Sequence, residues 1–284
     1  MYTSYWQLSK RPFESGIDPA AYYPSETHQS SLLKLRYALE HGNSMGVLCG
    51  DSGMGKTLLV KLLAERGGET YAPWVHVVFP QMSTAELLAF VAADLNADGN
   101  ANALAETISG DRPTQGIDVS IRQIGERLKR IATSGGRAVL VIDEAHLLEG
   151  QRTFETLRLL LNFEHGGQSD LMLLLVGRAS LLPMLERLPQ LDERVGVKCL
   201  LRPLNVEETM SYVQHRLQQA GARKPIFTTA ALETVHGIAR GMPRRINRLC
   251  DLALLVGFAE EQKQIGDRHI ETVAQELVEM TAGE

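Results

Sequence analysis

The stretch "CGDSGMGKTL", Cys49 to Leu58, decides the fold. It places three glycines around one lysine and one threonine, whereas an ordinary strand-to-helix turn needs only one glycine. Residues 50–57 fit the pattern G-x-x-x-x-G-K-[ST] of a phosphate-binding P-loop. The apolar run Met45–Cys49 precedes the pattern, and a helical run containing Leu58 to Leu63 follows it, so strand, loop and helix stand in the order that the motif requires. The sequence therefore predicts a site for a nucleoside triphosphate, and a glycine-rich turn that binds nothing is the alternative.

Each residue type in this loop has an expected task. Bare glycines let successive backbone N–H groups turn toward a phosphate, while the start of the following helix adds its positive dipole end. Lys56 is expected to reach the β- and γ-phosphates, and the Thr57 hydroxyl is expected to coordinate Mg²⁺. The residues predicted to bind ATP here are Gly50, Asp51, Ser52, Gly53, Met54, Gly55, Lys56, Thr57 and Leu58.

A second motif, "AVLVIDEAHLL", spans residues 138–148. A buried strand is expected to deliver Asp143 at its carboxyl end, which is the ligand-binding edge of open parallel sheets, and there the carboxylate can hold Mg²⁺. Glu144 follows directly and can polarise the attacking water as a general base. The alternative, that both acids merely cap the following helix, is weaker once the P-loop is taken into account.

Composition indicates the class of protein. With 284 residues, of which 44% are hydrophobic and 22% charged, the chain can bury the core of one large domain, or of a large and a small one. The formal net charge of −5 argues against nonspecific coating of nucleic acid by the monomer, although it leaves room for a local basic stripe. Cys49, Cys199 and Cys250 have no paired spacing, so they indicate neither a metal site nor a disulfide framework.

Hydropathy gives no sign of a membrane segment. The longest apolar runs, such as Leu171–Gly177, are far shorter than the ~20 residues that a membrane helix needs, and the first residues, "MYTSYWQLSKRPF", contain no apolar signal core. We expect a soluble protein of the cytoplasm.

Strand-like apolar runs alternate with helical periodicity, which is typical of βα units around a parallel sheet. The predicted strands are Met45–Cys49, Trp74–Phe79, Ala138–Ile142, Leu171–Val176 and Gly196–Leu201. The predicted helices between them are Glu26–Glu40, Gly55–Arg66, Thr84–Leu95, Val119–Thr133 and Thr153–Glu164. Residues 97–116, polar and rich in small side chains, are expected to form a peripheral loop or weak helix.

The pattern changes after "LRPLN", because only helical stretches appear from Val206 onward. The expected division is a nucleotide-binding domain over residues 1–203, with a leader over residues 1–43, and a helical domain over residues 204–284.

At this point the sequence resembles a known family, the ExeA/GspA-type AAA+ ATPases, which are related to the TnsC, MuB and IstB transposition ATPases. The resemblance covers nearly the whole chain. It lies in the leader "RPFESGIDPAAYYPSETHQSSLLKLRYALEHG", the segments "IDEAHLL" and "LRLLLNFE" around and after Asp143, and "GMPRRINRLCDLALL" near the end. It implies an α/β fold: a P-loop AAA+ domain with a five-stranded parallel sheet flanked by helices, followed by a small helical lid.

The resemblance also implies roles for three arginines. "LLLVGRASL" matches the strand between the P-loop strand and the Asp143 strand, which puts Arg178 at a position near the γ-phosphate; the family more often has glutamine there, and an exposed arginine at a helix start is the alternative. Arg244 in "GMPRR" matches the sensor arginine of the lid, with an ordinary surface arginine beside Arg245 and Arg248 as the alternative.

Arg194 in "QLDERVGVKCLL" matches the arginine finger that AAA+ subunits insert into the site of the adjacent protomer. By the strand order of the family it is expected on the far side of the sheet from the P-loop. The alternative is a salt bridge with Glu193 or Asp192, and Arg187 is the reserve candidate for the finger.

Several side chains have less specific expectations. Tyr22 and Tyr23 lie in a leader that the resemblance places beside the adenine, and packing on the core is the alternative. Asn162 and Glu164 could link subunit contacts to the catalytic acid, or could cap a helix end or face solvent. His146 is expected near the site rather than as a metal ligand, because no second histidine stands at ligand spacing.

We therefore expect an ATP hydrolase that uses Mg²⁺ and forms nucleotide-dependent homo-oligomers, as a ring or a helical filament. One role is the remodelling or assembly of a protein partner, as in ExeA; the sequence contains no match to the membrane-spanning and peptidoglycan-binding extension of the secretion members, which weakens a role at the cell envelope. The alternative role is an ATP-dependent scaffold on duplex DNA that recruits a transposase or another partner. Arg122, Arg127, Lys129 and Arg130 on one predicted helix could line such an oligomer or form an ordinary solvated face.

Overall fold

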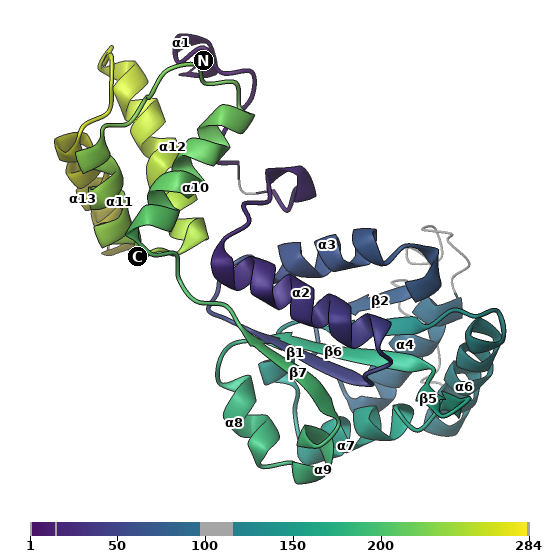
Figure 1. The fold of residues 1–284 in the computed structure, drawn as a ribbon. Helices are drawn as coiled ribbons and strands as arrows, with labels where there is room; N and C mark the ends of the chain where they lie inside the picture. Colours follow the sequence, from purple (N-terminus) through teal and green to yellow (C-terminus); the bar gives the residue numbers. More distant parts are fainter. Residues whose placement is uncertain (1, 15, 97–115, 283–284) are drawn as a thin grey trace. The chain divides into compact units, whose positions relative to one another are not determined.

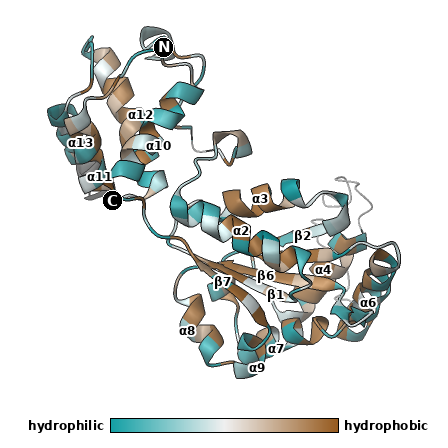
Figure 2. Cartoon of the chain, in the orientation of Figure 1, coloured by the Kyte–Doolittle hydropathy of each residue, from teal (hydrophilic) through white to brown (hydrophobic). Residues whose placement is uncertain are grey.

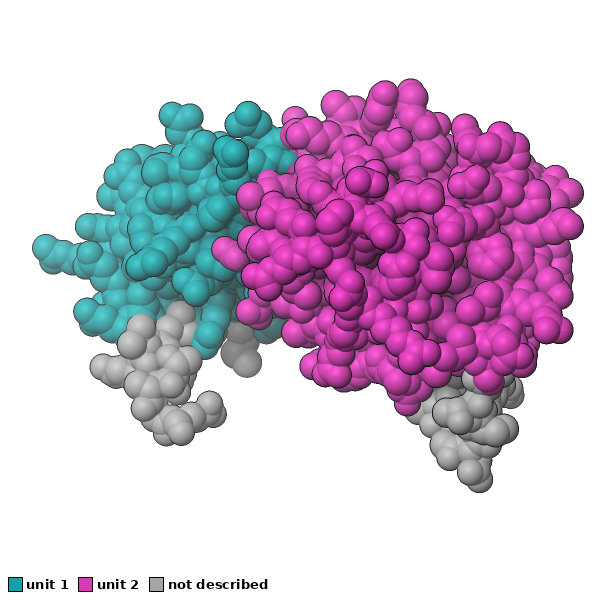
Figure 3. All heavy atoms as spheres, turned by 90° about the horizontal axis from the view of Figure 1, so that it is seen from below, with its two compact units in different colours: residues 1–28, 52–58, 202–284 teal, residues 29–51, 59–201 magenta. Residues whose placement is uncertain are grey.

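The computed structural model of the protein describes residues 2–14, 16–96 and 116–282, and its ribbon is drawn in Figure 1. The peripheral loop expected over residues 97–116 lies outside the described residues, apart from Gly116. The chain divides into two compact units, which Figure 3 colours separately. The helical unit comprises residues 1–28, 52–58 and 202–284, and the sheet unit comprises residues 29–51 and 59–201.

The sheet unit is built on five parallel strands in the order β2-β3-β6-β1-β7. Their bounds are β1 Met45–Cys49, β2 Trp74–Val77, β3 Ala138–Ile142, β6 Leu171–Gly177 and β7 Val195–Leu200. Every residue of the three inner strands is buried, because continuous apolar runs suit strands that are covered on both faces. Of these strands, β6 is labelled in Figure 2 and is brown, the colour of hydrophobic residues. The predicted fold class is confirmed.

Two edge strands differ from their expected bounds. The strand expected over Trp74–Phe79 ends at Val77, and Val78 and Phe79 are 66% and 65% exposed. Val78 and Phe79 were included in the prediction because they are apolar. However, β2 pairs only with β3, and that pairing runs from Trp74 to Val77. At the other edge, β7 begins at Val195 and ends at Leu200, one residue earlier than predicted.

Helices cover both faces of the sheet. On one face, alternate strand residues such as Val47, Leu140 and Leu173 form a single core with the helices α4, α6, α7, α8 and α9. On the other face lie α2 and α3, and a side chain at Gly46 would meet Leu35 of α2 at 3.3 Å. The bounds in this part of the chain are α2 Glu26–Glu40, α3 Lys56–Gly67, α4 Thr84–Asn96, α6 Ile117–Thr133, α7 Gln151–Leu160, α8 Leu181–Glu186 and α9 Pro189–Asp192, with the short hairpin β4 Glu164–His165 and β5 Gln168–Ser169 and the 3₁₀ turns η2 Glu69–Tyr71 and η3 Ala145–Leu147.

The helical unit packs around its own core. Its helices are α1 Tyr2–Tyr5, α10 Val206–Gln219, α11 Thr229–Ala239, α12 Pro243–Ala259 and α13 Asp267–Ala282, with the 3₁₀ turn η1 Pro19–Ala21. Among the described residues, none of these helices or those of the sheet unit is long and apolar enough to cross a membrane.

The first residues of the chain belong to the helical unit. Tyr2, Trp6 and Phe13 are buried in the same cluster as the apolar faces of α10 to α13. The Trp6 indole N–H donates to the Leu254 carbonyl oxygen at 2.9 Å, and the Arg216 Nε donates to the Pro12 carbonyl oxygen at 2.7 Å. This grouping differs from the sequence-based division at residue 203, because aromatic side chains at the start of the chain complete a core whose other buried members begin only at Leu204.

A buried arginine closes the amino edge of the sheet. Arg137 is 8% exposed, and its guanidinium donates to five carbonyl oxygens, those of Leu39, Gly42, Asn43, Ser169 and Leu171. Burial lowers the pKa of this guanidinium. The five acceptors belong to the end of α2 and to the chain that enters β1 and β6, so one side chain fixes where these elements meet.

We expect Arg137→Met to lower the melting temperature by about 8 °C, because several buried carbonyls would lose their donors at a combined cost of about 3 kcal/mol. Arg137→Lys keeps the charge but offers fewer donors, so its melting temperature should lie between those of Arg137→Met and the natural protein. Thermal unfolding followed by circular dichroism measures the effect. A change within about 1 °C for Arg137→Met would contradict this role.

Candidate nucleotide-binding site

The P-loop begins at the carboxyl edge of the sheet. β1 ends at Cys49, and the Gly50 N–H donates to the carbonyl oxygen of Gly177, the last residue of β6, at 3.1 Å. α3 begins at Lys56, so residues 50–55 form the turn between strand and helix. The predicted strand, loop and helix therefore stand in the order that the motif requires.

Two glycines give the loop a concave backbone. Gly53 and Gly55 have φ angles of +83° and +86°, in the left-handed region that favours glycine. A Cβ atom on Gly53 would lie 2.6 Å from the Arg244 Cβ, so no other residue fits there without a shift. Left-handed residues alternating with others turn successive N–H groups toward one point, which is the geometry of an anion-binding nest.

The residues at the start of α3 have the chemistry that phosphates need. Lys56 is 5% exposed, and an ammonium is buried only where acceptors or anions compensate for lost hydration. Thr57, the next residue in the chain, is partly buried, and Met54, two residues before Lys56, is fully buried. The loop therefore places a cation and a hydroxyl at a helix N-terminus.

Neighbouring side chains of the helical unit hold the loop from its outer side. The Arg244 backbone N–H donates to the Gly53 carbonyl oxygen at 3.3 Å, and the Arg244 Nη1 donates to the Ser52 hydroxyl at 3.2 Å. His28 Nε2 lies 2.8 Å from the Met54 carbonyl oxygen. The structure thus places Arg244 at the P-loop. Sequence reasoning missed His28, whose only sequence signal is a lone polar aromatic residue in the first turn of α2.

In the sheet unit, Asp143 and Glu144 follow β3 at the same carboxyl edge as Gly50. The Asp143 N–H donates to the Val77 carbonyl oxygen at 2.9 Å, and its carboxylate accepts from the Glu144 N–H at 2.9 Å. The second carboxylate oxygen of Asp143 lies 3.7 Å from the His76 Nε2. Several contacts therefore fix the Asp143 carboxylate within the sheet unit.

Glu144 has an unusual backbone conformation. Its φ of +48° lies in the left-handed region, which costs a non-glycine residue of order 1–3 kcal/mol and is found mainly where surrounding contacts impose it. Its side chain is 39% exposed, and one carboxylate oxygen lies 3.4 Å from the His146 Nδ1. The turn therefore leaves the Glu144 carboxylate accessible while the Asp143 carboxylate is buried.

β6 lies between β1 and β3, as expected, and ends at Gly177. Arg178 follows it and is exposed, and its backbone N–H donates to the His146 Nδ1 at 3.4 Å. His146 thus lies between the end of β6 and Glu144, near the site as predicted from sequence. A sensing role of Arg178 stays a prediction.

Arg194 lies at the amino edge of the sheet, opposite the P-loop. Val195 is paired with Met45, the first residue of β1, whereas the P-loop follows the last one, which puts Arg194 roughly 15 Å from Gly50 along the strands. The expectation that strand order separates the two was wrong: β7 is the immediate neighbour of β1, and the separation arises along the strand direction instead.

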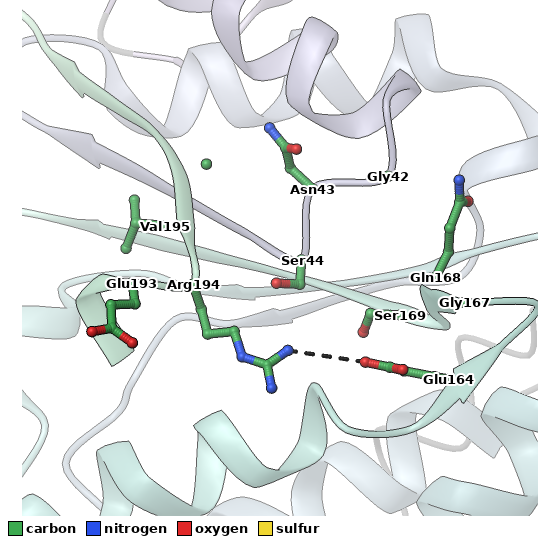
Figure 4. Close-up of a pocket in the computed structure, with 11 residues that line it drawn as sticks. Gly42, Asn43, Ser44, Glu164, Gly167, Gln168, Ser169, Glu193, Arg194 and Val195 are labelled. Carbon is green, nitrogen blue, oxygen red and sulfur yellow. Dashed lines mark ion pairs between the residues drawn. The ribbon is translucent and has the colours of Figure 1, made fainter. Parts of the chain in front are cut away.

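Within its own chain, the Arg194 side chain does not pair with Glu193 or Asp192, the partners that the alternative interpretation named, but with Asn162 and Glu164. Its Nη2 donates to the Asn162 side-chain oxygen at 3.0 Å, and its Nη1 lies 3.9 Å from a carboxylate oxygen of Glu164 (Figure 4). The Asp192 carboxylate pairs with Lys198 at 2.6 Å instead. The guanidinium lies at the wall of a cavity of about 330 Å³. Asn43, Ser44 and Ser169 also line this cavity and are labelled in Figure 4.

Other predicted residues have local contacts. The Tyr23 ring packs against Tyr212 of α10, with ring centroids 5.6 Å apart, inside the helical unit. On α6, the Arg127 Nε donates to the Leu95 carbonyl oxygen at 2.9 Å, and Arg130 lies 3.9 Å from Glu126. The basic residues of α6 are therefore not a continuous free stripe, because Arg127 helps to pack α6 on α4.

Comparison with known proteins agrees with this architecture. Residues 39–185, just over half of the chain, match the family model described as an AAA domain. Over 280 residues the chain is 33% identical to general secretion pathway protein A of Aeromonas hydrophila, an alignment that covers 98% of this chain and 48% of that protein. The chain therefore spans about half the length of this curated relative.

Solved structures share the fold. The ORC2 protein of Aeropyrum pernix, described in complexes with ADPNP and ADP, aligns with a TM-score of 0.66 and 15% identity over 94% of this chain and 71% of that one. Cdc6p of Pyrobaculum aerophilum aligns with a TM-score of 0.71 and 16% identity, over 93% of this chain and 70% of that one. The RuvB branch migration motor of Thermotoga maritima aligns with a TM-score of 0.58 and 19% identity, over 89% of this chain and 69% of that one. The AAA-domain match over residues 39–185 and the 33% identity to general secretion pathway protein A show that the chain belongs to the AAA family and, within it, to the GspA-type ATPases.

Proposed function

We propose that the protein binds ATP with Mg²⁺, hydrolyses it, and uses the nucleotide to assemble copies of itself that remodel or assemble a protein partner. The observation that carries the proposal is the P-loop, whose glycines at positive φ form a concave backbone directly before Lys56 and Thr57.

The residues fit Mg²⁺ as well as phosphate. The Thr57 hydroxyl and the Asp143 carboxylate are hard oxygen ligands, and Mg²⁺ usually takes only one or two such groups together with phosphates and water. Within the described part of the chain, no group of three or more His, Cys, Asp or Glu side chains could form a dedicated metal cage. Bound Mg²⁺ would neutralise the charge that develops on the phosphates during transfer.

The remaining roles belong to residues on either side of the loop. We assign phosphate binding to Lys56 and activation of the attacking water to Glu144, whose carboxylate is the accessible one of the two acids. Arg178 and Arg244 are proposed to contact the nucleotide, with the helices of residues 204–284 acting as the lid. Arg244 already touches Ser52 and Gly53, which supports its assignment.

Arg194 is proposed to act on the nucleotide of a neighbouring copy. It lies at the amino edge of the sheet, and its own P-loop begins at the carboxyl edge, a separation that one side chain does not span. Asn162 and Glu164 hold the guanidinium beside the surface cavity, where a second copy could meet it.

The class of partner comes from the relative. The relative is named for a general secretion pathway, and we infer from this that the partner of the present chain is a protein. We also propose a cytoplasmic location, because the proposed substrate is ATP and the buried thiols of Cys199 and Cys250 are not in disulfides.

A scaffold on duplex DNA is the second candidate, and the structure gives it less support. Of the four basic residues on α6, Arg127 packs against α4 and Arg130 lies near Glu126. If DNA is the partner, fluorescence anisotropy should show ATP-dependent binding of a duplex that weakens steeply with salt, because phosphate contacts release counterions. No ATP-dependent binding at low salt would favour the protein partner.

We expect Glu144→Gln to keep ATP affinity but to lower the turnover number by about 100-fold or more, because the amide cannot accept the proton of the attacking water. Lys56→Ala is the matched control and should lose ATP binding, because the main phosphate cation is gone. Calorimetry and steady-state phosphate release separate the two effects. Turnover of Glu144→Gln within about twofold of the natural protein would move the general base elsewhere.

Mixing two inactive variants tests the intersubunit site. We expect ATP or a nonhydrolysable analogue to drive self-association, and Arg194→Ala to impair both association and hydrolysis, since a finger supplied in trans can contribute ~10³-fold or more in rate. Arg194→Ala retains Glu144, and Glu144→Gln retains Arg194, so mixtures should recover part of the turnover. If turnover does not recover at any mixing ratio, although both variants are folded and co-assemble, Arg194 does not act in trans and only forms its ion pair with Glu164.

A further inference from the structure

His28 connects the start of α2 to the backbone of the P-loop. The side chain is buried, with an exposed fraction of 6%, and both ring nitrogens have partners. Nε2 lies 2.8 Å from the Met54 carbonyl oxygen, and Nδ1 lies 2.6 Å from the Ser25 hydroxyl oxygen. These three residues belong to the helical unit, as does the loop segment 52–58.

The hydrogen-bond partners fix the tautomer of His28. Burial lowers the pKa of the imidazole, which favours the neutral ring. A neutral ring carries one N–H, and since the Met54 carbonyl oxygen can only accept, this hydrogen is on Nε2. Nδ1 then accepts from the Ser25 hydroxyl, so each ring nitrogen has a partner suited to it.

The backbone at the start of α2 is anchored too. Ser25 is itself buried, and the Glu26 N–H donates to the Glu208 carboxylate of α10 at 3.1 Å. The other Glu208 carboxylate oxygen accepts from the Asn205 N–H at 3.0 Å in the capping box of α10. His28 therefore projects from a backbone that is tied to α10 in the same unit.

Peptide geometry converts this bond into a direction for the phosphate donor. In a planar trans peptide the C=O and the N–H point to opposite sides, so a Met54 carbonyl oxygen held toward His28 leaves the Gly55 N–H on the other side of the chain. The preceding carbonyl, that of Gly53, is likewise held on the outer side by the Arg244 N–H. Two consecutive peptides thus have their carbonyls bound to the helical unit.

We propose that His28 is a positioning residue for the nucleotide: by donating its Nε2 hydrogen to the Met54 carbonyl oxygen, it orients the Gly55 N–H toward the phosphate site before the nucleotide arrives. The inference rests on the proposed nucleotide binding at the P-loop. Orienting the donor in advance removes part of the ordering cost of binding. The gain is the same in the ground state and the transition state, so it should appear in affinity and not in the chemical step.

Two amide variants of different length provide a matched test. The Nε2 of Gln can take the place of the His28 Nε2, whereas the shorter Asn places its amide near the Nδ1 position and does not reach Met54. We expect His28→Ala and His28→Asn to weaken Mg-ADP binding by about tenfold, the usual effect of one lost hydrogen bond to a buried acceptor, and His28→Gln to restore most of it. Ser25→Ala, which frees the ring orientation, should fall between.

Calorimetry with Mg-ADP and steady-state hydrolysis of Mg-ATP give the readouts. KM for ATP should rise in parallel with the Kd for ADP, while kcat should stay within about twofold of the natural value. A merely structural loss would instead lower the active fraction of the protein, and hence kcat. Melting temperatures without nucleotide show which variants are folded. If His28→Ala does not fold, the comparison of His28→Gln with His28→Asn tests the proposal without it. If His28→Asn does not fold either, the affinity of Ser25→Ala for Mg-ADP tests the proposal.

Three results would overturn the role of His28. They are natural affinity in His28→Ala, equal weakening in the Gln and Asn variants, or a loss confined to kcat. A folded natural protein that does not bind Mg-ADP at all, and whose Lys56→Ala variant behaves identically, would instead refute the proposed nucleotide site, and the inference with it. The two failures are therefore distinguishable.

Discussion

Two consecutive carbonyl groups of the P-loop, those of Gly53 and Met54, accept hydrogen bonds from residues outside the loop. Their donors are the backbone of Arg244 and the ring of His28. With both carbonyls held on the outer side, the N–H groups of the same peptides point the other way, and the left-handed glycines at 53 and 55 make that arrangement sterically accessible. A phosphate site made of backbone amides depends on this constraint, because amides that must first reorient bind more weakly.

The residues of the loop are divided between the two compact units. Gly50 and Asp51 belong to the sheet unit, where the Gly50 N–H bonds to the end of β6, and residues 52–58 belong to the helical unit with His28 and Arg244. In the sheet unit, Asp143 and Glu144 follow β3 at the carboxyl edge, while Arg137 closes the amino edge and Arg194 lies there beside Glu164. Parallel strands thus separate the two acids to which we assign roles in hydrolysis from the arginine that we assign to a neighbouring copy.

Local sequence was enough for the fold class and for the position of the P-loop between a strand and a helix. β1, β3 and β6 are continuous apolar runs, which suit a sheet covered on both faces, and the P-loop pattern falls between a strand and a helix. Both signals lie within short stretches of sequence, so they can be recognised without knowing which distant residues they contact. What sequence could not give are pairings across the chain. Trp6 finds its acceptor at Leu254, and Arg194 finds Asn162 and Glu164 instead of the acids beside it. The His28 bond to Met54 spans 26 residues and ends on a backbone atom, which leaves no trace in residue type at the acceptor.

Crystal structures of the protein without nucleotide and with Mg-ADP would test the central claim most directly. The account predicts that the Met54–Gly55 peptide has one orientation in both, with the His28 bond kept at its present 2.8 Å and the Gly55 N–H within hydrogen-bonding distance of a phosphate oxygen in the complex. A peptide that flips between the two structures, with the Met54 carbonyl oxygen facing the phosphate site when nucleotide is absent, would contradict it.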